Sequence, residues 1–226
     1  MDSLATGCHG LDRLLGGGFP IGHICLIYGE ASTGKTILAM QCSLEAARKG
    51  SKIFYLDADQ SFSPNRVQRL VDREELAEQI ILFRPEEFRE QTRIVENLEN
   101  MLTKTPTLLV IDSITGLYRA LEDRSERFFN RDRELNRELA HLGALTTHHR
   151  IWVLLTGQVH SSPSRGHWII EPVATRTLKH WSDLILRLRQ TPRRGVRECI
   201  VEKRKGIEVS GTHCLFEITE KGIKDV

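Results

Sequence analysis

Short, unbroken apolar runs recur along the chain, and each is followed by a longer stretch with helical spacing. Because the runs do not alternate with polar residues, both faces of each predicted strand should be buried, as in a parallel sheet between two helical layers. The pattern therefore predicts an α/β fold with a mostly parallel sheet, in one domain spanning residues 1–226. The predicted strands cover residues 24–28, 52–57, 80–83, 107–111 and 151–156.

The pattern changes after Gly157. Residues 158–179 contain three turn-forming residues and no strong periodicity, which predicts a long loop, and loops of this length in compact domains usually carry function. Three further strands, joined by tight turns, predict a C-terminal antiparallel extension of the sheet; they cover residues 183–189, 197–203 and 214–219.

Composition narrows the class of protein. The formal net charge is only +2, so any affinity for nucleic acid must come from local clusters of cations. The five cysteines are scattered and form no C-x-x-C pair, which favours free thiols in a reduced compartment, with Cys25 and Cys42 buried. No apolar run is long enough for a membrane span, and no signal peptide is recognisable. We therefore expect a cytoplasmic protein.

The strongest motif lies between the first strand and its helix. The spacing G-x-x-x-x-G-K-T is that of a P-loop, in which glycines let successive backbone N–H groups face phosphate oxygens at a helix N-terminus. The lysine would neutralise the outer phosphates, and the threonine hydroxyl would hold Mg²⁺. The motif predicts ATP binding by Gly29, Glu30, Ala31, Ser32, Thr33, Gly34, Lys35 and Thr36.

Three polar residues end other predicted strands at the same sheet edge, where ligands gather in open α/β sheets. Asp112 closes an apolar strand in the manner of a Walker B carboxylate and would help to hold Mg²⁺. Asp59 could orient or deprotonate the attacking water, although Asp57 competes for that role. Gln158 could sense the γ-phosphate. The predicted catalytic residues are Lys35, Asp59 and Gln158.

Several motifs, in order along nearly the whole chain, resemble the RecA/RadA recombinase family. They comprise Ala5-Thr6-Gly7, Leu11-Asp12, Leu14 to Gly18, Gly29 to Thr36, Tyr55 to Asp59, Phe62, Pro64 to Arg66, Asp112-Ser113, Gln158-Val159 and Ile218 to Ile223. The resemblance implies a RecA-like P-loop ATPase core. Only five residues precede Thr6, so we expect no N-terminal DNA-binding domain, as in the short archaeal paralogues of RadA.

The resemblance also implies roles for single residues. Arg66 would stack on adenine. Asp59 stands where the recombinases carry a glutamate and is one methylene shorter, so we expect slow hydrolysis. A first DNA-binding loop would include Arg124 and Arg127, in a stretch whose alternating charges also fit a solvated helix, and a second would contain Arg165.

A basic stretch near the C-terminus gives a further hypothesis about DNA. Between residues 187 and 205, eight cations are opposed by two glutamates, and a projecting turn would offer Arg193, Arg194 and Arg197 to phosphates. A charged, solvated strand edge explains the same pattern. Lys203 and Lys205 also resemble paired cations that some RecA-like ATPases insert into a neighbour's nucleotide.

These observations favour a recombination mediator that binds ATP and single-stranded DNA, hydrolyses ATP weakly and assists a RadA-type recombinase. With so few residues ahead of Thr6, we expect the segment by which RadA subunits join to be absent, and the loop after Gln158 departs from the recombinase pattern. We therefore expect a homodimer or small oligomer rather than long filaments. It would be associated with the nucleoid. An active, DNA-stimulated RecA-like motor is the alternative, and a metabolic kinase is disfavoured because it has no use for a Gln158 sensor.

Overall fold

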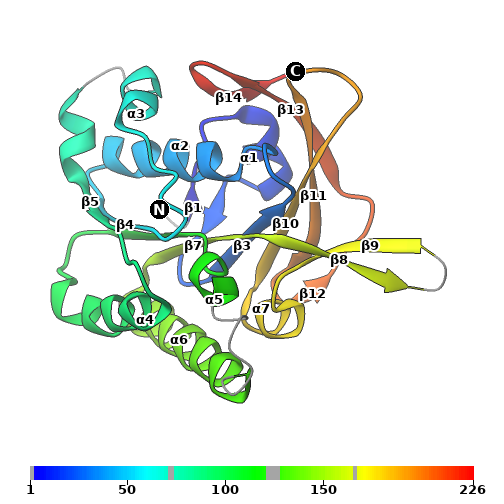
Figure 1. Ribbon diagram of the computed structural model, residues 1–226. Helices are drawn as coiled ribbons and strands as arrows, with labels where there is room; N and C mark the ends of the chain where they lie inside the picture. Colours follow the sequence, from blue (N-terminus) through cyan, green and yellow to red (C-terminus); the bar gives the residue numbers. More distant parts are fainter. Residues whose placement is uncertain (1–2, 71–73, 121–127, 165–166) are drawn as a thin grey trace.

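A twisted sheet runs through the centre of the protein, as a computed structural model covering residues 3–70, 74–120, 128–164 and 167–226 shows (Figure 1). Its strand order is β14-β13-β11-β10-β3-β7-β6-β4-β5, and the six strands from β10 to β5 are mutually parallel. All five strands predicted in the first part of the chain are confirmed. The parallel strands are β3 (Ile24–Gly29), β4 (Lys52–Asp57), β5 (Ile80–Phe83), β6 (Thr107–Asp112), β7 (Trp152–Gly157) and β10 (Leu184–Gln190).

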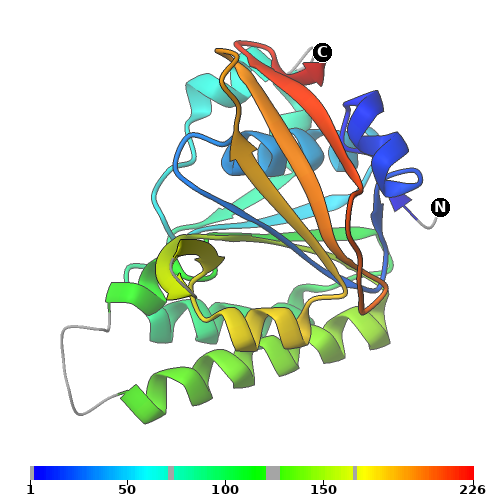
Figure 2. The ribbon, with the colours of Figure 1, turned by 90° about the vertical axis from the view of Figure 1, so that its right-hand side faces the viewer.

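Helices cover both faces of this sheet, as the unbroken apolar runs predict (Figure 2). In β3, Cys25 and Ile27 pack toward one face while Leu26 and Tyr28 pack toward the other, and all four are almost completely buried. The first face is covered by α1 (His9–Leu15), α2 (Lys35–Arg48), α3 (Pro64–Leu70) and a 3₁₀ turn (Glu74–Gln79). The second is covered by α4 (Phe88–Asn97), a 3₁₀ turn (Leu98–Met101), α5 (Gly116–Ala120), α6 (Phe128–His149) and α7 (Thr175–Trp181).

The antiparallel extension begins where β10 turns back into β11. Antiparallel pairs then join β10 to β11, β11 to β13 and β13 to β14, with β12 as a short strand beside β11. The predicted extension is confirmed. The sequence pattern missed two of its strands, which are too short to show alternation. The extension contains β11 (Val196–Arg204), β12 (Ile207–Glu208), β13 (His213–Thr219) and β14 (Gly222–Asp225).

The predicted long loop at 158–179 is wrong. The chain there forms an antiparallel ribbon of β8 (Val159–Ser164) and β9 (His167–Pro172), followed by α7. A two-stranded ribbon lies outside the main sheet, so its strands need no uniform apolar pattern and tolerate prolines on edges that bear no ladder hydrogen bonds. The ribbon lies on the right-hand side of Figure 1 and follows β7 along the chain.

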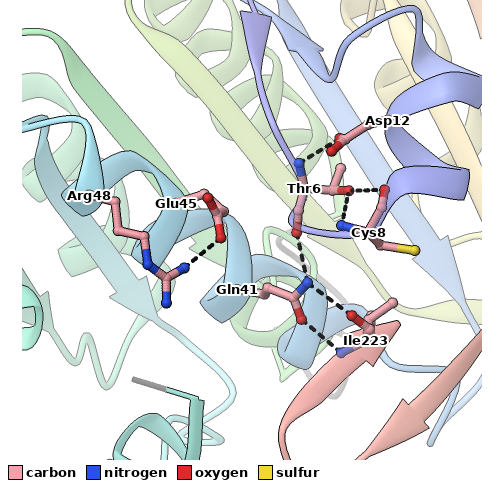
Figure 3. A network of polar contacts seen from close by, with 7 residues as sticks. All are labelled: Thr6, Cys8, Asp12, Gln41, Glu45, Arg48 and Ile223. Carbon is pink, nitrogen blue, oxygen red and sulfur yellow. Dashed lines mark hydrogen bonds and ion pairs between the residues drawn. The ribbon is translucent and has the colours of Figure 1, made fainter. Parts of the chain in front are cut away.

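Gln41, a buried residue of α2, ties both ends of the chain to the helix that follows the P-loop (Figure 3). Its side-chain amide donates to Thr6 O (2.9 Å) and Ile223 O (3.1 Å), and its Oε1 accepts from Ile223 N (2.7 Å). Gly7 is required beside it, because a Cβ at that position would lie 2.9 Å from Gln41 Nε2. The Thr6-Gly7 motif is thus explained by packing against α2.

The beginning and end of the chain also meet at α1. The carboxylate of Asp225 accepts from Gly10 N (2.5 Å) and Cys8 Sγ (3.2 Å), supplying a cap to a helix whose own N-cap residue provides none. These hydrogen bonds hold the pKa of Asp225 below its ordinary value. A two-stranded sheet of β1 (Ser3–Leu4) and β2 (Phe19–Pro20) completes this corner. The β1–β2 sheet and the cap fix α1 beside the C-terminal extension.

The cysteine prediction is confirmed: the five cysteines are free thiols, with Cys25 and Cys42 buried in the core. Burial raises the pKa of Cys42 well above its ordinary value, so this thiol is chemically inert. Among the described residues, no helix is long and apolar enough to cross a membrane.

Candidate ATP site

The P-loop lies where β3 passes into α2, at the carboxyl edge of the parallel strands. Gly34 takes a left-handed conformation (φ +100°), and a Cβ there would lie 2.9 Å from Ile218 Cδ1 of β13. A Cβ on Gly29 would lie 2.2 Å from Leu188 O of β10. Both glycines of the motif are therefore required by close contacts with the neighbouring strands.

The start of α2 fits an anionic ligand. No side chain caps this helix, so its first N–H groups and its positive dipole end are available to phosphate. The ammonium group of Lys35 donates to Gly29 O (2.8 Å) and Glu30 O (2.9 Å). Burial lowers the pKa of Lys35, whereas Asp112, Asp59 and Glu30 oppose that shift. A nearby phosphate would favour the charged lysine in the same way.

Asp112 ends β6 and is 2 % exposed. Its carboxylate accepts from the hydroxyls of Tyr55 (2.9 Å) and Thr156, and the nearby P-loop hydroxyl of Thr36 also favours its ionised form. Burial raises the pKa of Asp112 even though these donors favour its ionised form. The predicted magnesium pair, Thr36 and Asp112, is thus brought together by the fold.

Asp59 follows β4 and is exposed, close to Asp112. Its carboxylate accepts from Ser113 Oγ (2.9 Å) and Gln158 Nε2 (3.1 Å). Gln158 Oε1 in turn accepts from the guanidinium of Arg119 at 2.9 Å. The two candidate catalytic residues at 59 and 158 are therefore in direct contact, and a chain of hydrogen bonds continues from them into α5.

Asp57, the competitor for the role of general base, has a structural role. It is completely buried, and its carboxylate accepts from Ser61 N (2.7 Å) and Phe62 N (3.1 Å). Arg84 lies 3.5 Å from the same carboxylate. Because its acceptor atoms are occupied by the following turn, Asp57 is unsuited to contact a substrate.

Arg66 lies on the exposed start of α3, beside a groove of about 680 Å³. Ile37 of α2 and Ile218 of β13 contribute to the lining of the groove, so it adjoins both the P-loop helix and the C-terminal extension. Its size is in the range of small-molecule sites.

The predicted DNA-contacting residues divide into three groups. Arg193 and Arg194 are exposed in the turn between β10 and β11, and their side chains have no partner within the described ranges. Arg197, in contrast, donates to Ser32 O of the P-loop (3.0 Å). Arg124, Arg127 and Arg165 lie outside the described residues.

The rest of the basic stretch is largely occupied by contacts within the chain. Arg189 pairs with Glu198 across the β10–β11 ladder, and Arg204 donates to Leu14 O. Lys203 donates to Lys179 O (2.7 Å) at the end of the sheet opposite the P-loop. Lys205 is exposed in the following turn. The basic stretch therefore does not form a continuous basic face; Arg193 and Arg194 at the tip of the hairpin are its cations best placed to contact DNA.

Sequence reasoning missed several residues of the site. Ser113 could have been suspected from its place after the Walker B aspartate. Tyr55 and Thr156 lie within apolar strands, and their contact with Asp112 depends on the order of β4, β6 and β7. Arg119 belongs to no recognisable motif. Its contact with Gln158 arises only because the fold brings α5 to the end of β7.

Comparison with known proteins agrees with this geometry. The profile of the Rad51 family matches residues 1–226. DNA repair and recombination protein RadB of Thermococcus gammatolerans is 40 % identical over 228 residues, covering 99 % of each chain, and that of Thermococcus kodakarensis is 38 % identical with the same coverage. The crystal structure of the RadB recombinase superposes with a TM-score of 0.83 at 38 % identity, covering 99 % of each chain. The chain therefore belongs to the Rad51 family and, within it, to the RadB group of DNA repair and recombination proteins, with a RecA-like fold.

Proposed function

We propose that the protein binds ATP with Mg²⁺ at the P-loop. The observation that carries this proposal is the uncapped N-terminus of α2 beside Lys35, with Thr36 and Asp112 close together. The helix amides and the lysine would hold the phosphates, while Thr36 and Asp112 would hold the ion. When bound, Mg²⁺ neutralises charge that develops between the outer phosphates. Arg66 would stack on adenine across the adjoining groove.

We further propose that hydrolysis is slow, so that ATP acts mainly as a conformational ligand. Asp59 would orient the attacking water, yet its carboxylate is shared between Ser113 and Gln158. Gly116 also approaches it so closely that a Cβ there would lie 1.9 Å from Asp59 Oδ1. A short, engaged carboxylate is poorly placed to reach a water on the phosphate.

Gln158 would report the state of the nucleotide. It joins Asp59 at the sheet edge to Arg119 in α5, and its backbone O accepts from Val173 N at the end of the β8–β9 ribbon (2.9 Å). A phosphate that competes for the Gln158 amide would release Asp59 and disturb these contacts. Such a change in hydrogen bonding is the usual way in which a γ-phosphate controls neighbouring segments.

In the cell we propose a mediator role in recombination: the protein would bind single-stranded DNA and assist a RadA-type recombinase, as a homodimer or small oligomer. The family relationship supports this role, as do the two exposed arginines at the hairpin tip. Contacts between arginine and phosphate would make the affinity for DNA strongly dependent on salt.

The proposal is tested by equilibrium binding of ATP and by capture of partners. Wild-type protein should bind ATP in the presence of Mg²⁺, and Lys35→Ala should weaken binding by about 100-fold, since a buried charge-assisted contact is lost. The recombinase should be recovered from extract by wild-type protein in ATP and much less by Lys35→Ala. Failure of the wild-type protein to bind ATP would overturn the proposal.

A DNA-stimulated motor is the second candidate. One observation favours it: Lys35, Asp59 and Asp112 lie close together at one sheet edge, and these are the kinds of group that rapid ATP hydrolysis requires. The rate of turnover in the presence of DNA distinguishes the two functions.

A further inference from the structure

Side-chain donors reach every backbone carbonyl of the P-loop from residue 29 to residue 32. Lys35 donates to the first two, Gly29 O and Glu30 O, and Thr33 Oγ1 also donates to Glu30 O at 2.8 Å. These donors belong to the motif itself. The carbonyls of Ala31 and Ser32 receive donors from a different part of the chain.

Those donors come from the β10–β11 hairpin. Gln190, the last residue of β10, donates through Nε2 to Ala31 O (3.3 Å), and Arg197, near the start of β11, donates through Nε to Ser32 O (3.0 Å). A second nitrogen of Arg197 donates to Val196 O (2.9 Å), which fixes the guanidinium on its own strand. The hairpin thus holds the part of the loop that the motif leaves unsupported.

The physical effect is on the direction of the loop's N–H groups. In a trans peptide the C=O and the N–H point in opposite directions, so fixing the carbonyls of Ala31 and Ser32 also fixes the N–H groups that follow them. A phosphate-binding nest consists of successive N–H groups that point inward. Ser32 is also left-handed (φ +61°), a conformation that a serine adopts only when its surroundings hold it. Preorganising such a loop lowers the entropy lost when phosphate binds.

We propose that Gln190 and Arg197 are positioning residues of the phosphate site, and that through them the hairpin couples its tip to the nucleotide. This inference rests on the proposed ATP binding. Arg193 and Arg194 lie at the tip of the hairpin. In the sequence they fall between Gln190 and Arg197, the two residues that hold the P-loop. Nucleic-acid phosphates bound there would move the hairpin and change the hold on Ala31 and Ser32. By reciprocity, bound ATP changes the affinity of the tip for DNA by the same factor.

The test compares two arginines of one hairpin. Arg197→Met removes the donor to Ser32 O, whereas Arg189→Met removes an equal charge that pairs with Glu198 and does not contact the loop. We expect Arg197→Met to weaken ATP and ADP binding by about 5- to 30-fold, the value of one charged hydrogen bond, and to leave adenosine binding unchanged. Arg189→Met should remain within about twofold of wild type. Arg197→Lys should restore part of the affinity.

The salt dependence of ATP affinity distinguishes a positioning role of Arg197 from a long-range effect of its charge. The deficit of Arg197→Met should persist in about 0.5 M salt, where charges beyond a few ångströms are screened. Gln190→Leu removes the donor to Ala31 O without changing the charge of the protein. Because Gln190 is exposed, this variant should weaken ATP binding by only about threefold. An oligonucleotide should alter the ATP affinity of wild type and not that of Arg197→Met.

Equal ATP affinities for Arg197→Met and Arg189→Met, or a deficit that vanishes in high salt, would overturn this inference while leaving the proposed function standing. Wild-type protein that does not bind ATP at all would overturn the proposed function instead. The four variants can be compared for folding by circular dichroism, and Gln190→Leu gives an independent result if Arg197→Met does not fold.

Discussion

Asp112 and Glu138 are buried carboxyl groups in two regions of the molecule, and they differ in the charged groups that surround them. Asp112 lies at the carboxyl edge of the sheet and is 2 % exposed; Glu138 belongs to α6, contacts α4 and is completely buried. Each accepts hydrogen bonds from neutral groups. Asp112 is bonded by Tyr55 and Thr156, and Glu138 is bonded by the side chains at 91 and 92, at 2.9 and 3.0 Å.

The difference lies in their charged neighbours. Glu138 has another acid, Glu96, nearby, and burial raises the pKa of Glu138 to about 7. Burial also raises the pKa of Asp112, which has the acid Asp59 nearby, but Asp112 in addition lies near the cation Lys35 and the P-loop hydroxyl of Thr36. Neutral donors are insufficient to keep a buried carboxyl ionised, so a carboxyl without a nearby cation favours a proton, whereas one beside a cation favours the charged form. The structure therefore distinguishes a packing carboxyl from a proposed ion ligand by its charged neighbours.

The largest expected effect comes from Asp112→Asn. With the charge removed, ATP affinity should become independent of Mg²⁺, and any turnover should fall by about 100-fold or more, because the ion loses its carboxylate. Nucleotide titrations in Mg²⁺ and in a chelator would measure this. Glu138→Gln is the matched control and should keep the dependence on Mg²⁺. Equal losses in both variants would contradict the proposal that Asp112, unlike Glu138, holds the ion.

Glu138→Gln should change how stability depends on pH. Below about pH 4.5 the carboxyl is protonated in both folded and unfolded chains, whereas above about pH 7 the folded chain must ionise it. The contribution of Glu138 to the free energy of unfolding is therefore lost as pH rises, by about 3 kcal/mol in total. Denaturant unfolding of both proteins at pH 5 and pH 8 would measure this, with the variant gaining relative to wild type at the higher pH. A constant difference between them would contradict the assignment.

A smaller effect is expected from Tyr55→Phe. The ring keeps its packing against Phe62, while Asp112 loses one of its donors. The concentration of Mg²⁺ that half-saturates nucleotide binding should rise by about three- to tenfold, corresponding to one hydrogen bond. Tyr28→Phe is the control, because the Tyr28 hydroxyl bonds Glu202 away from the site and its loss should leave the Mg²⁺ dependence unchanged.

Much of the fold could be predicted because its signals are local. The strand from Ile24 to Tyr28 is an unbroken apolar run, and the P-loop spacing fixes both its turn and its helix. The β8–β9 ribbon was missed because a ribbon outside the sheet requires no apolar pattern. Short β14 was missed for its length, although Gln41 and α1 hold it firmly in place.

The site was predictable where a residue ends a strand, and unpredictable where two elements meet. Asp112 and Gln158 were identified because each follows a buried run. The contact of Asp59 with Gln158, by contrast, depends on the order of β4, β6 and β7 in the sheet. Arg197 resembled a DNA contact because charge alone does not show which way a side chain turns.

We propose that ATP acts in this protein as a ligand that is hydrolysed slowly. The most direct test is steady-state ATP turnover by the wild-type protein, with and without single-stranded DNA, at saturating Mg²⁺. We expect turnover well below about 1 per second, changed little by DNA. Turnover stimulated by DNA into the range of about 1–100 per second would contradict it and would favour a motor.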